Sequence, residues 1–239
     1  VLTAIFNGSG DSKTPFIINT IGLLFNIIFD PLLILGFGSI PALGVLGAAL
    51  ATVAAQIMVT ICFVVVMIRS KVNDLKVDLF KKPDIVSMKT LCRLGLPGAV
   101  QSGSFTLIAM ILGRLVAVYG AVPIAVQKVG SQIESISWMT AGGFSTALGA
   151  FVGQNYGAKQ YERIQKGYRT TLMLALGLGG FTTSLLIFAG RPIFTFFLPE
   201  AEAIHQGTDY LKILGYSQLF MCIEITTQGL FNGLGRTYI

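Results

Sequence analysis

The chain has 239 residues, of which 53% are hydrophobic and only 12% are charged, and its formal net charge is +6. The charged share is about half that of an ordinary soluble domain, which argues against a water-soluble fold. The surplus of basic residues is spread over several loops and does not gather on one face, so we expect no nucleic-acid partner.

Apolar residues gather into runs that are long enough to cross a bilayer, which takes about 20 residues of helix. Runs of this length without alternation satisfy their backbone in lipid as helices. The sequence therefore predicts an all-α integral membrane protein, a polytopic helix bundle with six full spans, at 15–36, 44–68, 96–119, 122–151, 162–189 and 207–234.

Lysine and arginine follow every second span, whereas two of the loops between the other spans are nearly uncharged and the third holds Arg191 together with Glu200 and Glu202. The positive-inside rule then places loops 69–95 and 153–161 in the cytoplasm. We expect a multi-pass protein of the plasma (inner) membrane.

The longest polar stretch, 69–95, contains "KPDIVSMKTLCRLG", where Ile85, Met88 and Cys92 recur at helical spacing. This pattern predicts a short amphipathic helix on the inner membrane surface, with a flexible linker as the alternative. The stretch divides the chain into 1–68, the end of one lobe, the linker 69–95, and 96–239, the first four helices of a second lobe.

The phrase Phe-Asn-Gly-x-Gly stands at both ends of the chain, at 6–10 and 231–235, with six predicted crossings between the copies. An even number of crossings places both copies on the same side, as in a parallel repeat of two six-helix lobes. Chance identity among 28 glycines is the alternative. Because the chain begins inside a helix without Met, we expect an internal fragment of a twelve-helix protein.

Three acidic residues fall inside predicted spans: Asp30, Glu134 and Glu224. A carboxylate at bilayer depth is costly without partners and is a functional candidate for that reason. Asn26 lies one turn before Asp30 on the same helical face, and Thr52 has a similar depth on the next helix. Their oxygen atoms suit either a hard monovalent cation or a proton held on the carboxylate. Alternatively, Asp30 begins a kink with Pro31 and caps backbone groups that the kink frees.

Other polar and aromatic residues are weaker candidates for a substrate cavity: Gln101, Glu134, Trp138 and Glu224. Glutamines within spans also bond to neighbouring helices, and Trp138 is alternatively a packing residue. Gly142 and Gly143 are expected to allow close helix packing, with flexing of their helix as the alternative. We expect no cofactor, and no metal beyond a possible Na⁺ at Asp30.

Four phrases in order, "FNGSGDSKTP", "NIIFDPLLILG", "PALGVLGAALAT" and "GQNYGAK", resemble the signatures of the multidrug and toxic compound extrusion (MATE) transporters. The resemblance implies two pseudo-symmetric six-helix lobes around a central cavity, alternating access, and export driven by H⁺ or Na⁺. On the family's map the chain runs from the end of helix 4 to the end of helix 10, so helices 1–3, 11 and 12 are missing.

In some prokaryotic members of that family, an Asn and an Asp one turn apart on helix 5 bind the coupling cation with a Thr on helix 6 and an Asp on helix 1. Asn26, Asp30 and Thr52 match the first three. Na⁺-coupled members also carry a Glu on helix 7, where "PGAVQSGSFTLIAM" offers only Gln101, and an acid on helix 10 about a turn before the position of Glu224. The resemblance therefore favours the first lobe for ion coupling.

The resemblance predicts a secondary active antiporter that exports drugs or other organic, often cationic, compounds. A lipid or glycan-lipid flippase of the same superfamily is the alternative, but only Arg114 and Lys128 offer cavity cations, and both lie close enough to the surface to snorkel. An enzyme is not expected, because the one histidine, His205, falls in an expected loop and no HExxH or GxSxG motif is present. The expected partners are small-molecule substrates and the lipid bilayer, and the expected state is a monomer.

Overall fold

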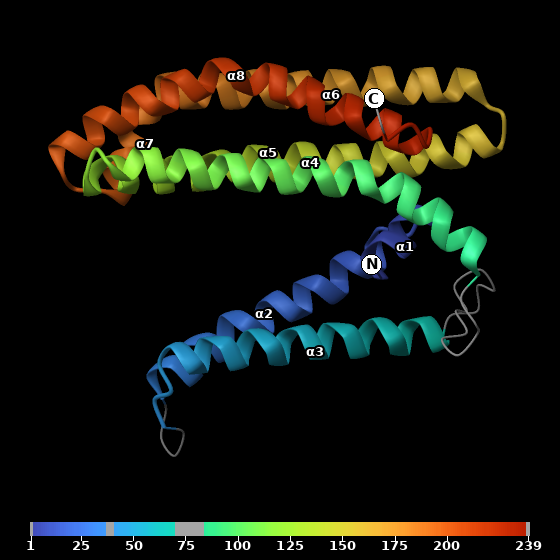
Figure 1. Ribbon diagram of the computed structural model, residues 1–239, viewed down its shortest axis with the longest axis horizontal. Helices are drawn as coiled ribbons and strands as arrows, with labels where there is room; N and C mark the ends of the chain where they lie inside the picture. Colours follow the sequence, from blue (N-terminus) through green and yellow to red (C-terminus); the bar gives the residue numbers. More distant parts are fainter. Residues whose placement is uncertain (1, 37–40, 70–83, 238–239) are drawn as a thin grey trace. The chain divides into compact units, whose positions relative to one another are not determined.

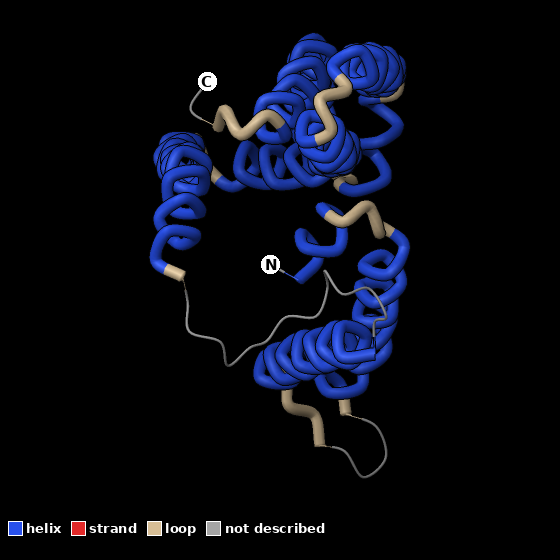
Figure 2. Tube along the Cα trace, turned by 90° about the vertical axis from the view of Figure 1, so that its right-hand side faces the viewer, coloured by secondary structure: helices blue, strands red, loops and turns tan. Residues whose placement is uncertain are grey.

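The computed structural model describes residues 2–36, 41–69 and 84–237, and within these ranges it contains helices and no strand (Figure 2). The chain divides into two compact units, Val1–Lys82 and Pro83–Ile239. The division falls within the polar stretch 69–95, of which residues 70–83 lie outside the described ranges.

Unit 1 consists of α1 (Leu2–Gly8), α2 (Lys13–Leu35) and α3 (Val45–Arg69). Helices α2 and α3 run side by side as an antiparallel pair (Figure 1). At one end of the pair, Phe6 from α1 joins a core of Ile18, Phe63 and Met67. At the other end, the last carbonyls of α2 are satisfied by the returning chain, because the amides of Leu43 and Gly44 donate to Leu33 and Ile34 at 3.0 and 3.1 Å.

Unit 2 contains α4 (Ile85–Ala117), α5 (Ala121–Gly157), α6 (Tyr161–Phe188), the short α7 (Gly190–Phe197) and α8 (Ala201–Gly233). Helices α5, α6 and α8 pack together along most of their length (Figure 1). Helix α7 packs on α8, where the ring of Phe194 lies directly on Gly207. Helix α4 lies beside α5 and buries none of its residues within the unit.

The closest approach between α5 and α8 depends on glycine. A Cβ on Gly229 would overlap the backbone of Ser145, and one on Gly233 would overlap the backbone of Gly149. Gly142 and Gly143 have open space around their Cβ positions. The expectation that these two glycines serve close packing is therefore wrong, and Gly149, Gly229 and Gly233 have that role instead.

Each of the six predicted spans coincides with a long helix, and the protein is a helical membrane bundle. By length and composition, α2, α3, α4 and α6 are apolar enough to cross a membrane. Helices α5 and α8 are at least as long but more polar, and the polar side chains buried in unit 2 all belong to them: Ser137, Asn155, Gln218 and Thr226. The packing within unit 2 keeps these four side chains away from lipid.

The predicted short surface helix is not a separate element. Helix α4 continues without a break from Ile85 to Ala117, through Pro97. Asp84 caps its first turn by accepting hydrogen bonds from the amides of Val86 and Ser87 and from the Ser87 hydroxyl at 2.6 Å. The amphipathic pattern is thus the first part of the same helix that forms the third predicted span.

Candidate functional site

Helices α2 and α3 meet along a seam in which every fourth residue faces the partner. On α3 these residues are small near one end and large near the other: Gly47, Ala51, Ala55, Val59, Phe63 and Met67. On α2 the seam runs through Ile18 and Gly22, which is buried beneath Val59. Continuing by fours along α2 leads to Asn26 and then to Asp30.

The register of the seam places Asn26 and Asp30 opposite alanines. Along the length of the seam, Gly22 contacts Val59 at one point, and the backbone of Leu33 contacts Gly47 further toward the other end. Between these contacts the antiparallel register sets Asn26 against Ala55 and Asp30 against Ala51, both of which are buried. Methyl side chains leave room for the amide and the carboxylate between the helices.

The Oδ1 atoms of Asn26 and Asp30 are both buried and have no hydrogen-bond partner among the described residues. Leaving a buried acceptor unpaired costs about 1–3 kcal/mol, and more for a charged group. Two such oxygens one turn apart are suited to a group that accepts their lone pairs, either a monovalent cation or a proton. The alternative role for Asp30, capping backbone groups at Pro31, receives no support, because its buried Oδ1 accepts no backbone hydrogen bond in the described ranges.

Thr52 lies one residue beyond Ala51, on the exposed side of α3. Its hydroxyl donates to the carbonyl of Ala48 at 2.9 Å, so its lone pairs remain available as an acceptor. The structure brings Asn26 and Asp30 onto one seam and leaves Thr52 beside it. No three His, Cys, Asp or Glu side chains within the described ranges are grouped so as to hold a metal.

In unit 2, Glu134 lies on the face of α5 that packs on α8, and it has a partner that the sequence did not identify. The Nε2 of Gln218 on α8 donates to Glu134 Oε1 at 3.2 Å, and Gln218 Oε1 accepts from the Ser137 hydroxyl at 2.8 Å. The signal in the sequence was the position of Gln218 on a stripe of buried small and apolar residues that includes Gly215 and Cys222.

The other cavity candidates lie on the exposed surface of unit 2. Gln101 on α4 accepts a hydrogen bond from Gln228 on α8 at 3.0 Å, as expected of a glutamine that joins neighbouring helices. Glu224 lies one turn before Gln228 and is exposed, and Trp138 is 55% exposed, so this tryptophan does not pack in the core of the unit.

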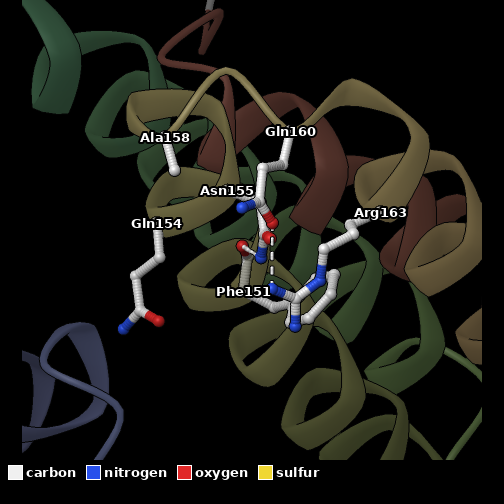
Figure 3. Close-up of a pocket in the computed structure, with 6 residues that line it drawn as sticks. All are labelled: Phe151, Gln154, Asn155, Ala158, Gln160 and Arg163. Carbon is white, nitrogen blue, oxygen red and sulfur yellow. Dashed lines mark hydrogen bonds between the residues drawn. The ribbon is translucent and has the colours of Figure 1, made fainter.

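A hollow of about 280 Å³ lies elsewhere, where α5 ends and α6 begins (Figure 3). Three of its polar side chains form local contacts. Arg163 donates to Gln160 at 2.9 Å and lies 6.0 Å from the centre of the Phe151 ring, and Asn155 donates to the Phe151 carbonyl at 2.7 Å. These contacts brace the turn between two helices, and none of the predicted site residues lines the hollow.

Comparison with known proteins relates the chain to one family. The family model described as MatE matches residues 97–239. The chain is 29% identical to a "Probable multidrug resistance protein NorM" of Thermotoga maritima, over 99% of this chain and 51% of the relative. It is 30% identical to "Probable multidrug resistance protein YoeA" of Bacillus subtilis, over 91% of this chain and 48% of the relative. Neither name denotes an enzyme.

Among solved structures, the fold resembles that of the Vibrio cholerae MATE transporter VcmN in its bent form. The TM-score is 0.83 at 22% sequence identity, covering 99% of this chain and 53% of the other. The chain thus spans about half the length of the proteins that it matches.

Proposed function

Because this chain belongs to the MatE family, we propose that the protein is a secondary active antiporter, which exports drugs or other organic, often cationic, compounds under a gradient of H⁺ or Na⁺. The proposed substrates follow from the names of two relatives, which are probable multidrug resistance proteins. The proposed location is the plasma membrane, with loops 69–95 and 153–161 in the cytoplasm and the protein acting as a monomer.

The observation that carries the coupling role is the pair of buried, unpartnered oxygens on Asn26 and Asp30. A coupling ion must bind with unequal affinity in the outward- and inward-facing states, since a ligand shifts an equilibrium only through such a difference. A carboxylate and an amide held between two helices meet this need, because a small change in helix separation alters how well their oxygens surround H⁺ or Na⁺. Thr52 would add its hydroxyl oxygen from the edge of the seam.

The test is gradient-driven export from proteoliposomes, with ethidium as the transported organic cation. We expect Asp30→Asn to abolish export under an imposed H⁺ or Na⁺ gradient while ethidium still binds. Asn26→Ala and Thr52→Ala should weaken ion binding and leave the fold intact.

Asp11→Asn is the matched control, because Asp11 lies in unit 1 in the turn before α2, where it caps the amides of Lys13 and Thr14. It should export at the wild-type rate. Export by Asp30→Asn at that rate would make Asp30 a structural acid and overturn the proposal.

A further inference from the structure

Gln218 is completely buried between α5 and α8, and its side-chain amide contacts polar groups at both ends. Its oxygen accepts from Ser137, which is itself 4% exposed. Its nitrogen donates to Glu134 at 3.2 Å and to the carbonyl of Leu214 at 3.4 Å. A carboxyl, an amide and a hydroxyl thus form a short relay across the helix interface.

The orientation of the amide matches an ionised Glu134. A carboxylate only accepts hydrogen bonds, so the NH₂ group must face it, and the amide oxygen then needs the donor that Ser137 supplies. The reversed amide would set its oxygen against the carboxylate and the Leu214 carbonyl, which are both acceptors. Each polar end of Gln218 is therefore satisfied when Glu134 carries a charge.

The same three groups also satisfy a protonated Glu134. If the amide turns over, the carboxyl O–H donates to Gln218 Oε1, and Nε2 donates to the oxygen of Ser137. The serine proton then bonds to a carbonyl one turn earlier in its helix, as the nearby Ser135 does with Gln132 at 2.7 Å. The turned amide then gives up its contact with the Leu214 carbonyl, which keeps its own backbone hydrogen bond within α8. An amide turnover thus allows a change of charge without leaving a buried group unpaired, which would be costly in a membrane interior.

We propose that Glu134, Gln218 and Ser137 form a proton-binding site between α5 and α8, in which the Gln218 amide turns over when Glu134 takes up a proton. Gln218 and Ser137 are positioning residues, and Glu134 holds the proton. The site lies in a different unit from Asp30, and it does not depend on the antiport function proposed above.

Titratable and charged groups also lie on the helices around the relay. On α8, the Tyr210 ring lies on Gly130, one turn before Glu134, and Cys222 is buried one turn after Gln218. On α5, Lys128 lies about 240° around the helix from Glu134. Helix α4 carries Lys89 and Arg93 in its first part and Arg114 in its last turn, and α6 has no charged residue between Thr170 and Phe188.

The test is infrared spectroscopy of the purified protein in lipid nanodiscs during a pH titration. A carboxylic-acid C=O band that disappears in Glu134→Gln reports the proton on Glu134, and an amide C=O band that disappears in Gln218→Leu reports Gln218. We expect both bands to change with one midpoint. Gln218→Leu removes the hydrogen-bond partner of both forms of Glu134, but the loss costs the charged form more. The acid band should therefore persist to a pH about one unit higher, a tenfold change in proton affinity.

Ser137→Ala tests whether Ser137 belongs to the relay together with Glu134 and Gln218. Ser137→Ala should change the pH midpoint of the Glu134 acid band by about one unit, which is a tenfold change in proton concentration. Ser137→Thr keeps the hydroxyl and should titrate like the wild type. Ser135→Ala is the matched control, since its hydroxyl lies on the same helix outside the relay, and it should have no effect. The proposal is overturned if no band is lost in Glu134→Gln, or if Ser137→Ala titrates as the wild type does. Ser137→Ala also decides the outcome should Gln218→Leu fail to fold.

Discussion

Gly10 and Gly235, near opposite ends of the chain, adopt the same left-handed conformation and end their helices with the same hydrogen bonds. Their φ angles are 89° and 70°. Gly10 donates to Asn7 at 3.0 Å and Gly235 to Asn232 at 3.1 Å, and in each copy the next amide donates to the phenylalanine carbonyl five residues earlier. The repeated Phe-Asn-Gly-x-Gly phrase therefore encodes one type of helix C-cap, which the Gly at its end makes possible.

A third helix ends in the same way without a glycine. At the end of α5, Lys159 has a φ of 57°, and the following amide of Gln160 donates to Asn155 at 2.9 Å. A side chain is strained in this conformation by about 1 kcal/mol or more. Lys159→Gly should therefore raise the free energy of unfolding by about 1 kcal/mol, and Gly235→Ala should lower it by a similar amount. Thermal unfolding in detergent measures both, and a loss of stability in Lys159→Gly would contradict the assignment of strain.

Two glycines of unit 2 should respond oppositely to alanine. Gly229→Ala places a methyl group against the backbone of Ser145, so α5 and α8 must separate, and we expect a loss of about 1–3 kcal/mol. Gly142→Ala meets open space and should gain up to about 1 kcal/mol from helix propensity. The same unfolding assay compares them, and equal effects would show that the α5–α8 contact does not depend on Gly229.

The first turn of α4 should weaken in acid. Hydrogen bonds from Ser87, through its side chain first and its backbone second, and from the amide of Val86 lower the pKa of Asp84 below its ordinary value of 3.8. Because the folded-state pKa is the lower one, this stabilisation is complete above the ordinary value and is lost as the pH falls through the folded-state value. Amide hydrogen exchange at Val86 and Ser87, corrected for intrinsic rates, should show protection falling in that range, and Asp84→Ala should lack the protection at any pH.

The predicted sidedness can be tested by labelling single cysteines after Cys62, Cys92 and Cys222 are replaced. A cysteine at Gln160 should react only with reagent supplied from the cytoplasm, and one at His205 only from outside. Ala203, in the same outer turn, is 1% exposed and unsuited to labelling, whereas the His205 side chain is 83% exposed. Reversed labelling at either position would overturn the topology and the parallel repeat with it.

The sequence predicted what depends on local spacing. The long apolar runs defined the six helices, and the interval of four residues placed Asn26 and Asp30 on one face. Contacts between distant segments could not be predicted from local spacing. The partner of Glu134 is Gln218 on another helix, and the spacing of residues within α5 does not identify it. The prediction that 84–95 contains a separate short helix failed for a related reason. Polar residues in this stretch indicated the edge of a span, whereas α4 continues from Ile85 to Ala117.

Glu224 and Asp30 should differ sharply in their importance for ion coupling. Asp30 has a buried, unpartnered oxygen on a tightly packed seam, whereas Glu224 is exposed on the surface of unit 2. Glu224 is not held between packed helices of unit 2, so a change in the packing of these helices alters its surroundings little, and it discriminates weakly between two conformations. In proteoliposomes, Glu224→Gln should therefore reduce gradient-driven export much less than Asp30→Asn does. Measuring both variants under an H⁺ gradient and then under a Na⁺ gradient also identifies the coupling ion, because only the productive gradient gives export that Asp30→Asn abolishes. A larger loss from Glu224→Gln would move the coupling site to the other unit.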